Sequence, residues 1–332
     1  MKHLIETTDW SEAEVQETLR LAAQLKKEKK GRADFIGKSM VLLFFNPSLR
    51  TRVSFIRAME QLGGSALAMD VGRDAWKLVT GEGVAMDGDG VEHIKEGVPV
   101  LGRYCDFVGI RAFGDMKSYE NDRKDDLIRS ASRVSTVPLV NMESAMAHPC
   151  QAFADALTVQ ETGRKNPNVV LSWVPHPKAV PMAVSNSFIL MAARMGWKVT
   201  LLRPERFPLD PEVMWKAAEL SRAAGGSFRE TDDRNAAYEG ADVVYAKSWG
   251  SAEGYGNPDF EKEKKKGLDD WRVDGTKMKR TNDAIFLHCL PVRRNVEVTD
   301  EILDSPSSKV IDQAENRLHA QKAVLLTMAE GK

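Results

Sequence analysis

Residues 40–55 read Met-Val-Leu-Leu-Phe-Phe-Asn-Pro-Ser-Leu-Arg-Thr-Arg-Val-Ser-Phe. The first six form an apolar run that is typical of a buried strand, and the run stops at Asn46-Pro47. A helical pattern follows, because Phe55 and Met59 recur on one face. A buried strand that leads directly into a helix favours the α/β class of fold.

The start of this helix has the composition of an anion-binding site. Pro47 and Ser48 open it, and Arg50 and Arg52 lie in its first turn. Backbone N–H groups and the positive end of the helix dipole would point at a ligand there, with guanidinium groups closing around it. The alternative is an ordinary capped helix with two solvated arginines.

Strand and helix candidates alternate along the chain in two series. The first series has strand candidates at 40–45, 66–70, 106–111 and 137–142. The second has them at 169–174, 198–203, 242–246 and 284–289. Helices are expected near 10–28, 49–62, 92–103, 122–133, 181–195, 211–224 and 315–330. Continuous apolar strands separated by helices predict two doubly wound parallel sheets, each covered on both faces.

The two series suggest two domains. We expect one over residues 1–145 and another over 150–302, with 303–332 forming a C-terminal helix that packs back on the first. A chain of 332 residues is long enough for two cores of ordinary size. The charge run 261–266 is predicted to be a solvated loop.

The composition excludes several classes of protein. Lys and Arg number 47 against 48 Asp and Glu, which argues against a general binder of nucleic acid or of membrane surfaces. No apolar stretch approaches the roughly 20 residues that span a bilayer, and the first residues lack the apolar core of a signal peptide. Three cysteines without short spacing suggest reduced thiols, so we expect a cytoplasmic protein.

Reactive side chains follow most of the expected strands. Arg111, Glu143, His176 and Lys247 come at or just after the carboxyl end of a strand. The segments His148-Pro149-Cys150-Gln151 and His288-Cys289-Leu290-Pro291-Val292-Arg293-Arg294 do the same. Ligands of open α/β sheets bind beyond these ends, so the pattern predicts a binding site made of these residues.

Common cofactor and metal motifs are missing. The His-Cys pairs do not have the spacing of a zinc site, and Asp87-Gly88-Asp89-Gly90 lacks the later ligands of a calcium loop, so a tight turn is expected there. No GxGxxG follows the first strand and no GxxxxGK[ST] occurs, which disfavours a dehydrogenase and an ATPase.

Three segments resemble the signatures of the aspartate/ornithine transcarbamylase family: Ser48-Leu49-Arg50-Thr51-Arg52, His148-Pro149-Cys150-Gln151 and His288-Cys289-Leu290-Pro291. They occur in the family's order and spacing, and the resemblance covers essentially the whole chain. Three others resemble its N-acyl-ornithine branch: Asp74-Ala75-Trp76, Trp173-Val174-Pro175-His176-Pro177-Lys178 and Tyr245-Ala246-Lys247-Ser248-Trp249.

The resemblance implies that an amine attacks the carbonyl of carbamoyl phosphate and phosphate leaves. It assigns the phosphate to residues 48–51, Arg111 and Arg317, and the developing oxyanion to Arg111 and His148. Gln151 and the carbonyls of Cys289 and Leu290 would accept from the carbamoyl NH2 group. The implied catalytic residues are Arg50, Arg111, His148 and Gln151. Positioning and electrostatics suffice for this chemistry, so no metal or organic cofactor is implied.

The same resemblance places an N-acyl-L-ornithine against Glu143, His176, Lys247, Leu290 and Arg293. Trp76 would reach in from a neighbouring subunit of a homotrimer with shared active sites. The branch also implies a knotted second domain, in which a segment around 235–250 threads the loop 174–181.

Three positions bear on the acyl group. Where Val91 stands, enzymes of the branch that use N-acetylornithine carry Glu and those that use N-succinylornithine carry Pro. Pro181 matches the succinyl pattern, and Glu297 stands where the acetyl enzymes carry a Lys that becomes carboxylated. Because Val does not repel a second carboxylate, N-succinyl-L-ornithine is favoured over N-acetyl-L-ornithine.

Some alternatives stay open on sequence alone. The chain could be a non-catalytic paralogue that binds carbamoyl phosphate, or another phosphate-handling α/β enzyme. Cys289 is expected to offer its backbone carbonyl rather than act as a nucleophile, and His288 could equally be a core histidine.

Overall fold

The computed structural model describes residues 1–28, 31–81 and 83–331. Two compact units make up the fold. Unit 1 consists of Met1–Gly114, Glu120–Cys150 and Arg317–Lys332, and unit 2 of Asp115–Tyr119 and Gln151–Asn316. Within the described part of the chain, no helix has the length and apolar character needed to cross a bilayer.

Unit 1 is built on a parallel sheet with the strand order β2-β1-β5-β6. Its strands are β1 (Ser39–Phe44), β2 (Ser65–Asp70), β5 (Phe107–Arg111) and β6 (Leu139–Glu143). A separate pair consists of β3 (Lys77–Val79) and β4 (Gly90–His93). The helices are α1 (Glu12–Lys27), α2 (Leu49–Gln61), α3 (Ile94–Tyr104), α4 (Tyr119–Lys124) and α5 (Asp126–Val134). The division into units falls within α6 (Pro149–Gln160) and α13 (Val310–Glu330), so each of these helices has residues in both.

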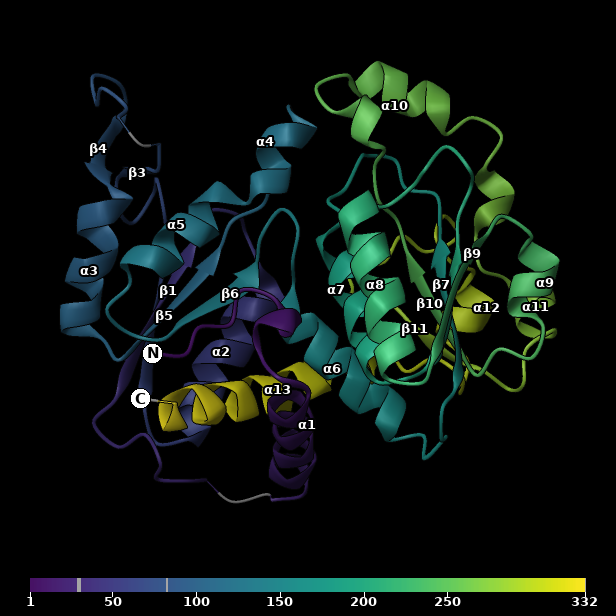
Figure 1. Ribbon diagram of the computed structural model, residues 1–332, viewed down its shortest axis with the longest axis horizontal. Helices are drawn as coiled ribbons and strands as arrows, with labels where there is room; N and C mark the ends of the chain where they lie inside the picture. Colours follow the sequence, from purple (N-terminus) through teal and green to yellow (C-terminus); the bar gives the residue numbers. More distant parts are fainter. Residues whose placement is uncertain (29–30, 82, 332) are drawn as a thin grey trace. The chain divides into compact units, whose positions relative to one another are not determined.

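Alternation along β1 explains how this sheet is covered on both faces. Val41 and Leu43 pack in a buried cluster with residues of α3 and α5, such as Val98 and Ile128. The intervening side chains point to the opposite face and are also buried. Helices α1, α2 and α13 lie together (Figure 1), and the hydroxyl oxygens of Thr18 in α1 and Thr327 in α13 are 3.1 Å apart. A strand that is apolar at every position therefore becomes the centre of a two-sided sheet.

The outer edge of β6 is paired by residues near the start of the chain. The backbone N–H of Leu4 donates to the carbonyl of Leu139, and the N–H of Asn141 donates to the carbonyl of Leu4. The side-chain amide of Asn141 also donates to the carbonyl of Ile5 at 2.9 Å. These bonds cover a sheet edge that would otherwise be open.

Unit 2 is a five-stranded parallel sheet with the order β11-β10-β7-β8-β9. Its strands are β7 (Asn168–Trp173), β8 (Lys198–Leu202), β9 (Ser227–Thr231), β10 (Val243–Lys247) and β11 (Ile285–Leu287). The helices are α7 (Ala183–Arg194), α8 (Pro211–Ala223), α9 (Arg234–Tyr238), α10 (Pro258–Lys264), α11 (Gly275–Met278) and α12 (Asp300–Leu303). Figure 1 shows α7 and α8 on one face of this sheet and α9 and α11 on the other.

The predicted fold class is confirmed, and several local predictions are wrong. The expected helix over 122–133 is two helices, because Asp125 takes a left-handed backbone conformation between them. Strand β9 was not expected, since its sequence Ser-Phe-Arg-Glu-Thr is polar and only partly buried at the sheet edge. The charge run 261–266 is not simply a solvated loop: it continues α10, and Glu261 in it is buried.

Each sheet has a point where the strand order reverses direction. In unit 1 the reversal falls between β1 and β5, and in unit 2 between β7 and β10. Ligands of doubly wound sheets bind at such points, beyond the carboxyl ends of the strands. The residues that follow β1, β5, β7 and β10 are therefore the candidates for a ligand-binding site.

Candidate active site

Helix α2 begins directly beyond β1 with a side-chain cap. The hydroxyl of Ser48 accepts a hydrogen bond from the backbone N–H of Thr51 at 3.2 Å. The other N–H groups of the first turn point out of the helix start, where bonds within the helix cannot satisfy them. Leu49, the first residue of α2, is 76% exposed.

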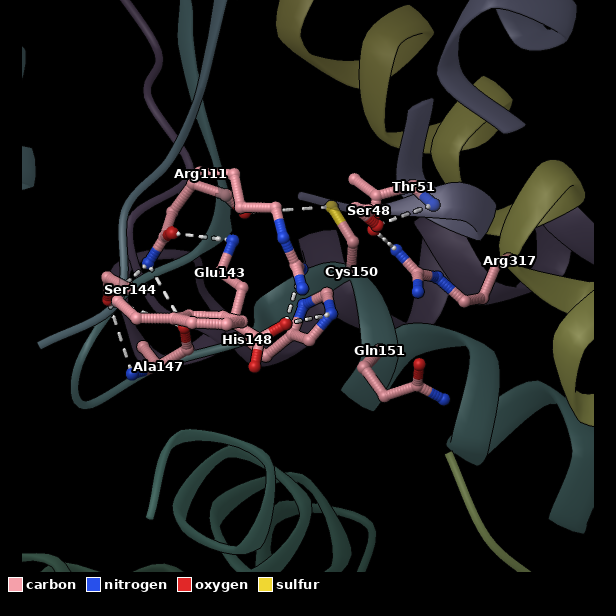
Figure 2. A network of polar contacts seen from close by, with 12 residues as sticks. Ser48, Thr51, Arg111, Glu143, Ser144, Ala147, His148, Cys150, Gln151 and Arg317 are labelled. Atoms are coloured by element: carbon pink, nitrogen blue, oxygen red, sulfur yellow. Dashed lines mark hydrogen bonds and ion pairs between the residues drawn. The ribbon is translucent and has the colours of Figure 1, made fainter. Parts of the chain in front are cut away.

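Arg317 of α13 reaches the same helix start. Its Nη2 atom donates to the Oγ1 atom of Thr51 at 2.8 Å, and both side chains are buried (Figure 2). Burial lowers the pKa of the Arg317 guanidinium, and the positive charges of Arg111 and Arg50 add to the effect. Three cations near one helix N-terminus are the arrangement that a multiply charged anion stabilises.

Arg111, Glu143 and His148 form a compact polar cluster at the ends of β5 and β6. Glu143 Oε2 accepts a hydrogen bond from Arg111 Nη1 at 2.5 Å and lies 3.3 Å from His148 Nε2 (Figure 2). The side chains of Arg111 and Glu143 are only 10% and 13% exposed. The guanidinium of Arg111 also lies 4.5 Å from the ring centroid of Phe113.

His148 is held in its neutral form. Burial lowers its pKa well below the ordinary value of 6.5, and the charges of Arg317, Arg111 and Arg50 lower it further. A neutral imidazole that carries its proton on Nε2 donates one hydrogen bond without adding positive charge. Burial also raises the pKa of the neighbouring Cys150 thiol to about 12, so this cysteine is not a thiolate nucleophile.

Sequence reasoning missed the residues that hold the loop between Glu143 and His148. Asn141 is fully buried; its Nδ2 donates to Ser144 Oγ at 2.9 Å, and its Oδ1 accepts from the Glu143 N–H at 3.0 Å. Ser144 donates to the carboxylate of Asp125 at 2.5 Å. The only sequence signal was a polar residue inside an apolar strand, which is a reason to look for such a network.

In unit 2, His176 follows β7 and Lys247 ends β10. Burial lowers the pKa of His176, and the charge of Lys247 contributes to this shift while that of Glu297 opposes it. Lys247 Nζ donates to the carbonyl of Ser248 at 2.9 Å. His176 and Lys247 therefore lie near one another at the second reversal point, while Pro181 lies just before α7, at a half-buried position.

The segment after β11 presents its backbone. Leu290 takes a left-handed conformation (φ 56°), and its N–H donates to His288 Nδ1 at 3.0 Å. His288 Nε2 lies 3.4 Å from Glu297 Oε1, and both side chains are 2% exposed. Glu297 Oε2 accepts from the backbone N–H of Arg293 at 2.7 Å. His288 is thus a buried residue that shapes the loop carrying Cys289, Leu290 and Arg293.

Gln151 lies in the first turn of α6 and is oriented within unit 2. Its amide donates to Asp155 Oδ1 at 2.7 Å, and Gln313 donates to the same oxygen at 2.6 Å. Gln313 in turn accepts from the backbone N–H of His288 at 3.0 Å. Hydrogen bonds therefore connect Gln151 to the segment that carries Leu290.

Two family models match this chain. Residues 2–161 match the carbamoyl-phosphate-binding domain of aspartate/ornithine carbamoyltransferase, and residues 181–328 match its aspartate/ornithine-binding domain. The chain belongs to the aspartate/ornithine carbamoyltransferase family.

Curated members of this carbamoyltransferase family match over most of their length. N-acetylornithine carbamoyltransferase of Xanthomonas axonopodis pv. citri is 46% identical, covering 99% of this chain and 97% of the relative. N-succinylornithine carbamoyltransferase of Bacteroides fragilis is 38% identical, covering 88% of each.

A solved structure shares the fold closely. It is a glutamate-to-valine mutant of N-acetyl-L-ornithine transcarbamylase with carbamyl phosphate and N-succinyl-L-norvaline, and it has a TM-score of 0.95 and 46% identity. The match covers 98% of this chain and 99% of that one.

Two expected site residues of this carbamoyltransferase lie elsewhere in unit 1. Val91 is on β4 and Trp76 immediately precedes β3, and their side chains are 64% and 58% exposed. Trp76 Nε1 donates to Glu92 Oε2 at 2.5 Å. Within unit 1 they belong to the small β3–β4 sheet and not to the ends of the main strands.

Proposed function

We propose that the protein transfers the carbamoyl group of carbamoyl phosphate to the side-chain amine of an N-acyl-L-ornithine, giving N-acyl-L-citrulline and phosphate in arginine biosynthesis. The observation that carries this proposal is the cluster of Arg50, Arg111 and Arg317 around a neutral His148 at the start of α2. Family membership over nearly the whole chain supports the reaction type.

Each donor residue has a physical task in this proposal. The N–H groups of residues 48–51 and the guanidinium groups of Arg50 and Arg317 bind the phosphate. Arg111 and His148 donate to the carbonyl oxygen, whose negative charge grows as the amine attacks. Gln151 and the carbonyls of Cys289 and Leu290 accept from the carbamoyl NH2 group. Phosphate leaves with the bonding electron pair, and its charge is already matched by the arginines.

Unit 2 supplies the acceptor contacts in the same proposal. Lys247 and Arg293 are cations suited to the carboxylates of an acyl-ornithine, and His176 and Leu290 add hydrogen bonds. Glu143 of unit 1 is the carboxylate that receives an N–H of the acceptor. No step in this scheme requires a metal or an organic cofactor.

We favour N-succinyl-L-ornithine as the acceptor, because Val91 carries no charge to repel the succinyl carboxylate. A mutant relative in which valine replaces a glutamate was solved with N-succinyl-L-norvaline, which supports the idea that such a change accommodates a succinyl group. Pro181 agrees with the same choice. The second candidate is N-acetyl-L-ornithine, favoured by the identity of 46% to an N-acetylornithine enzyme against 38% to an N-succinylornithine enzyme.

The assembly and setting belong to the same proposal. In a homotrimer, Trp76 and Val91, which are both exposed on unit 1, would complete the active site of a neighbouring subunit. We place this enzyme in the cytoplasm. The knot in the second domain stays a prediction.

The test is a three-acceptor assay. Purified protein with carbamoyl phosphate is offered N-succinyl-, N-acetyl- and free L-ornithine in parallel, and citrulline formation is followed by colour. We expect the highest kcat/KM with the succinyl substrate. A higher value for the acetyl substrate would show that N-acetyl-L-ornithine is the preferred acceptor. Robust activity on free ornithine would contradict the assignment to the N-acyl-ornithine branch. Binding of carbamoyl phosphate without turnover of any acceptor would indicate a non-catalytic paralogue.

A further inference from the structure

One carboxylate oxygen collects the two donors on which the proposed chemistry depends. Glu143 Oε2 is 2.5 Å from Arg111 Nη1 and 3.3 Å from His148 Nε2 (Figure 2). Under the proposed function these same two groups hold the carbonyl oxygen of carbamoyl phosphate. Two N–H groups that converge on one partly negative oxygen form an oxyanion-binding arrangement, and here the oxygen belongs to the protein.

The two oxygens would compete for the same N–H groups. A carbonyl oxygen that accepts from both Arg111 Nη1 and His148 Nε2 needs the two groups that Glu143 Oε2 contacts. Two oxygens that bear negative charge would also repel one another in this poorly solvated position, where both side chains of the Arg111–Glu143 pair are nearly buried. Binding of the donor therefore competes with this contact.

The backbone at Glu143 is fixed, so the exchange is confined to its side chain. Glu143 has a φ of 151°, an unusual value for a residue with a side chain. Asn141 Oδ1 accepts its N–H at 3.0 Å, and the N–H of Ala112 donates to its carbonyl at 2.9 Å. Rotation of the carboxylate away from Arg111 leaves these backbone bonds intact.

We propose that Glu143 is an internal competitor for the oxyanion-binding groups, and that carbamoyl phosphate displaces its carboxylate from Arg111 and His148. The displaced carboxylate is then available to accept an N–H of the acceptor. This inference rests on the proposed function and adds to it a coupling between the two substrates: occupation of the donor site releases a group of the acceptor site.

The coupling has a measurable consequence for affinity. The apparent dissociation constant of a ligand rises in proportion as the competent state becomes rarer. Removal of the competing carboxylate should therefore tighten binding of carbamoyl phosphate, although Glu143 touches both of the groups that bind it. A residue that merely holds Arg111 and His148 in place would have the opposite effect when removed.

The experiment measures binding of two probes by calorimetry to the wild type, Glu143→Ala and Glu143→Gln. Carbamoyl phosphate contains the carbonyl oxygen that competes with Glu143 Oε2. Inorganic phosphate lacks this oxygen, so its binding does not require Glu143 Oε2 to move. We expect Glu143→Ala to bind carbamoyl phosphate at least about fivefold more tightly than the wild type, with a clearly smaller change for inorganic phosphate. Glu60→Ala, which removes an exposed negative charge from α2, should leave both affinities within about twofold.

Three results would overturn the inference. Equal tightening for both probes would mean that only the charge of Glu143 matters. Unchanged or weaker binding of carbamoyl phosphate would mean that Glu143 orients its neighbours. A crystal structure of the wild type with carbamoyl phosphate in which Glu143 still contacts Arg111 would also exclude displacement, and this structure decides the question even if the variants fold poorly. Failure of the proposed function is distinct, because the wild type itself would then turn over none of the acceptors, whether or not it binds carbamoyl phosphate.

Discussion

The two reversal points have the same topology and opposite chemistry. Beyond β1 and β5, unit 1 gathers cationic side chains from segments far apart in sequence, and one neutral histidine among them. Beyond β7, β10 and β11, unit 2 has two cations, Lys247 and Arg293, and a loop in which Leu290 takes a left-handed conformation. The comparison teaches that the sheet decides where a ligand binds, whereas the few residues after each strand decide which ligand it is.

The supports of the two regions differ as well. In unit 1, Asn141, Ser144 and Asp125 hold the loop of His148 by buried side-chain hydrogen bonds. In unit 2, a buried histidine and carboxylate, His288 and Glu297, bond to backbone N–H groups and so fix the shape of a loop. We therefore expect substitution of Arg111 or His148 in unit 1 to affect the chemical step and substitution of Lys247 in unit 2 to affect acceptor binding.

The largest effect is expected from Arg111→Met in unit 1. Loss of one donor to the developing oxyanion should lower kcat by about 10³-fold. Steady-state kinetics with both substrates saturating measures this, and Arg57→Met, which removes an exposed arginine of α2, is the matched control. A fall in kcat of less than about tenfold would place Arg111 outside the reacting centre.

Lys247→Met tests the other side of the comparison. A lost charge-assisted contact should raise KM for the N-acyl-ornithine about 10- to 100-fold and leave KM for carbamoyl phosphate nearly unchanged. Lys266→Met, on the exposed part of the charge run, serves as control. If both KM values rose together, the division of labour between the units would be wrong.

Val91→Glu should change selectivity and little else. A new carboxylate repels the second carboxylate of a succinyl group, so the ratio of kcat/KM for succinyl over acetyl substrate should fall about tenfold. Val53→Glu, another exposed valine of unit 1, gives the matched addition of charge. An unchanged ratio would mean that Val91 does not face the acyl group in the assembled enzyme.

The smallest effect concerns stability and pH. The folded-state pKa of His148 lies well below 6.5, so the unfolded chain binds a proton there more readily than the folded one. The stability contributed by this group is present above pH 6.5 and is lost as the pH falls toward its folded-state pKa, by roughly 1 kcal/mol per pH unit. The difference in Tm between the wild type and His148→Gln should therefore shrink by a few degrees from pH 7.5 to pH 5.5. A constant difference over this range would show that His148 is not buried as a neutral ring.

The sequence predicted the strands and the residues at their ends because both depend on local signals. A continuous apolar run such as 40–45 marks a central strand, and the polar residue that follows it lies at the binding edge by topology alone. Strand β9 lacked this signal, since edge strands alternate and are partly exposed. The prediction of a solvated loop over 261–266 failed at Glu261 for a related reason. Glu261 is buried against Ser251, ten residues earlier, and the charged residues next to Glu261 in sequence give no sign of this contact.

Long-range polar contacts account for the rest. Asn141 and Asp125 could not be assigned from sequence, because their partners lie across a loop or near the start of the chain. Glu143 was predicted only as an acceptor residue, and its contact with Arg111 links residues 32 positions apart. Residue types and strand order predict which side chains lie at the same edge of a sheet, but not which of these side chains contact one another in the absence of a ligand.

The pairing of residues near the start of the chain with β6 connects those residues to the loop that carries His148. Asn141 bonds Ile5 with the same side chain that fixes the backbone of Glu143. A proteolytic nick, a bulky fusion or a shortened expression clone at residues 3–5 would thus disturb the loop of His148 through the side chain of Asn141.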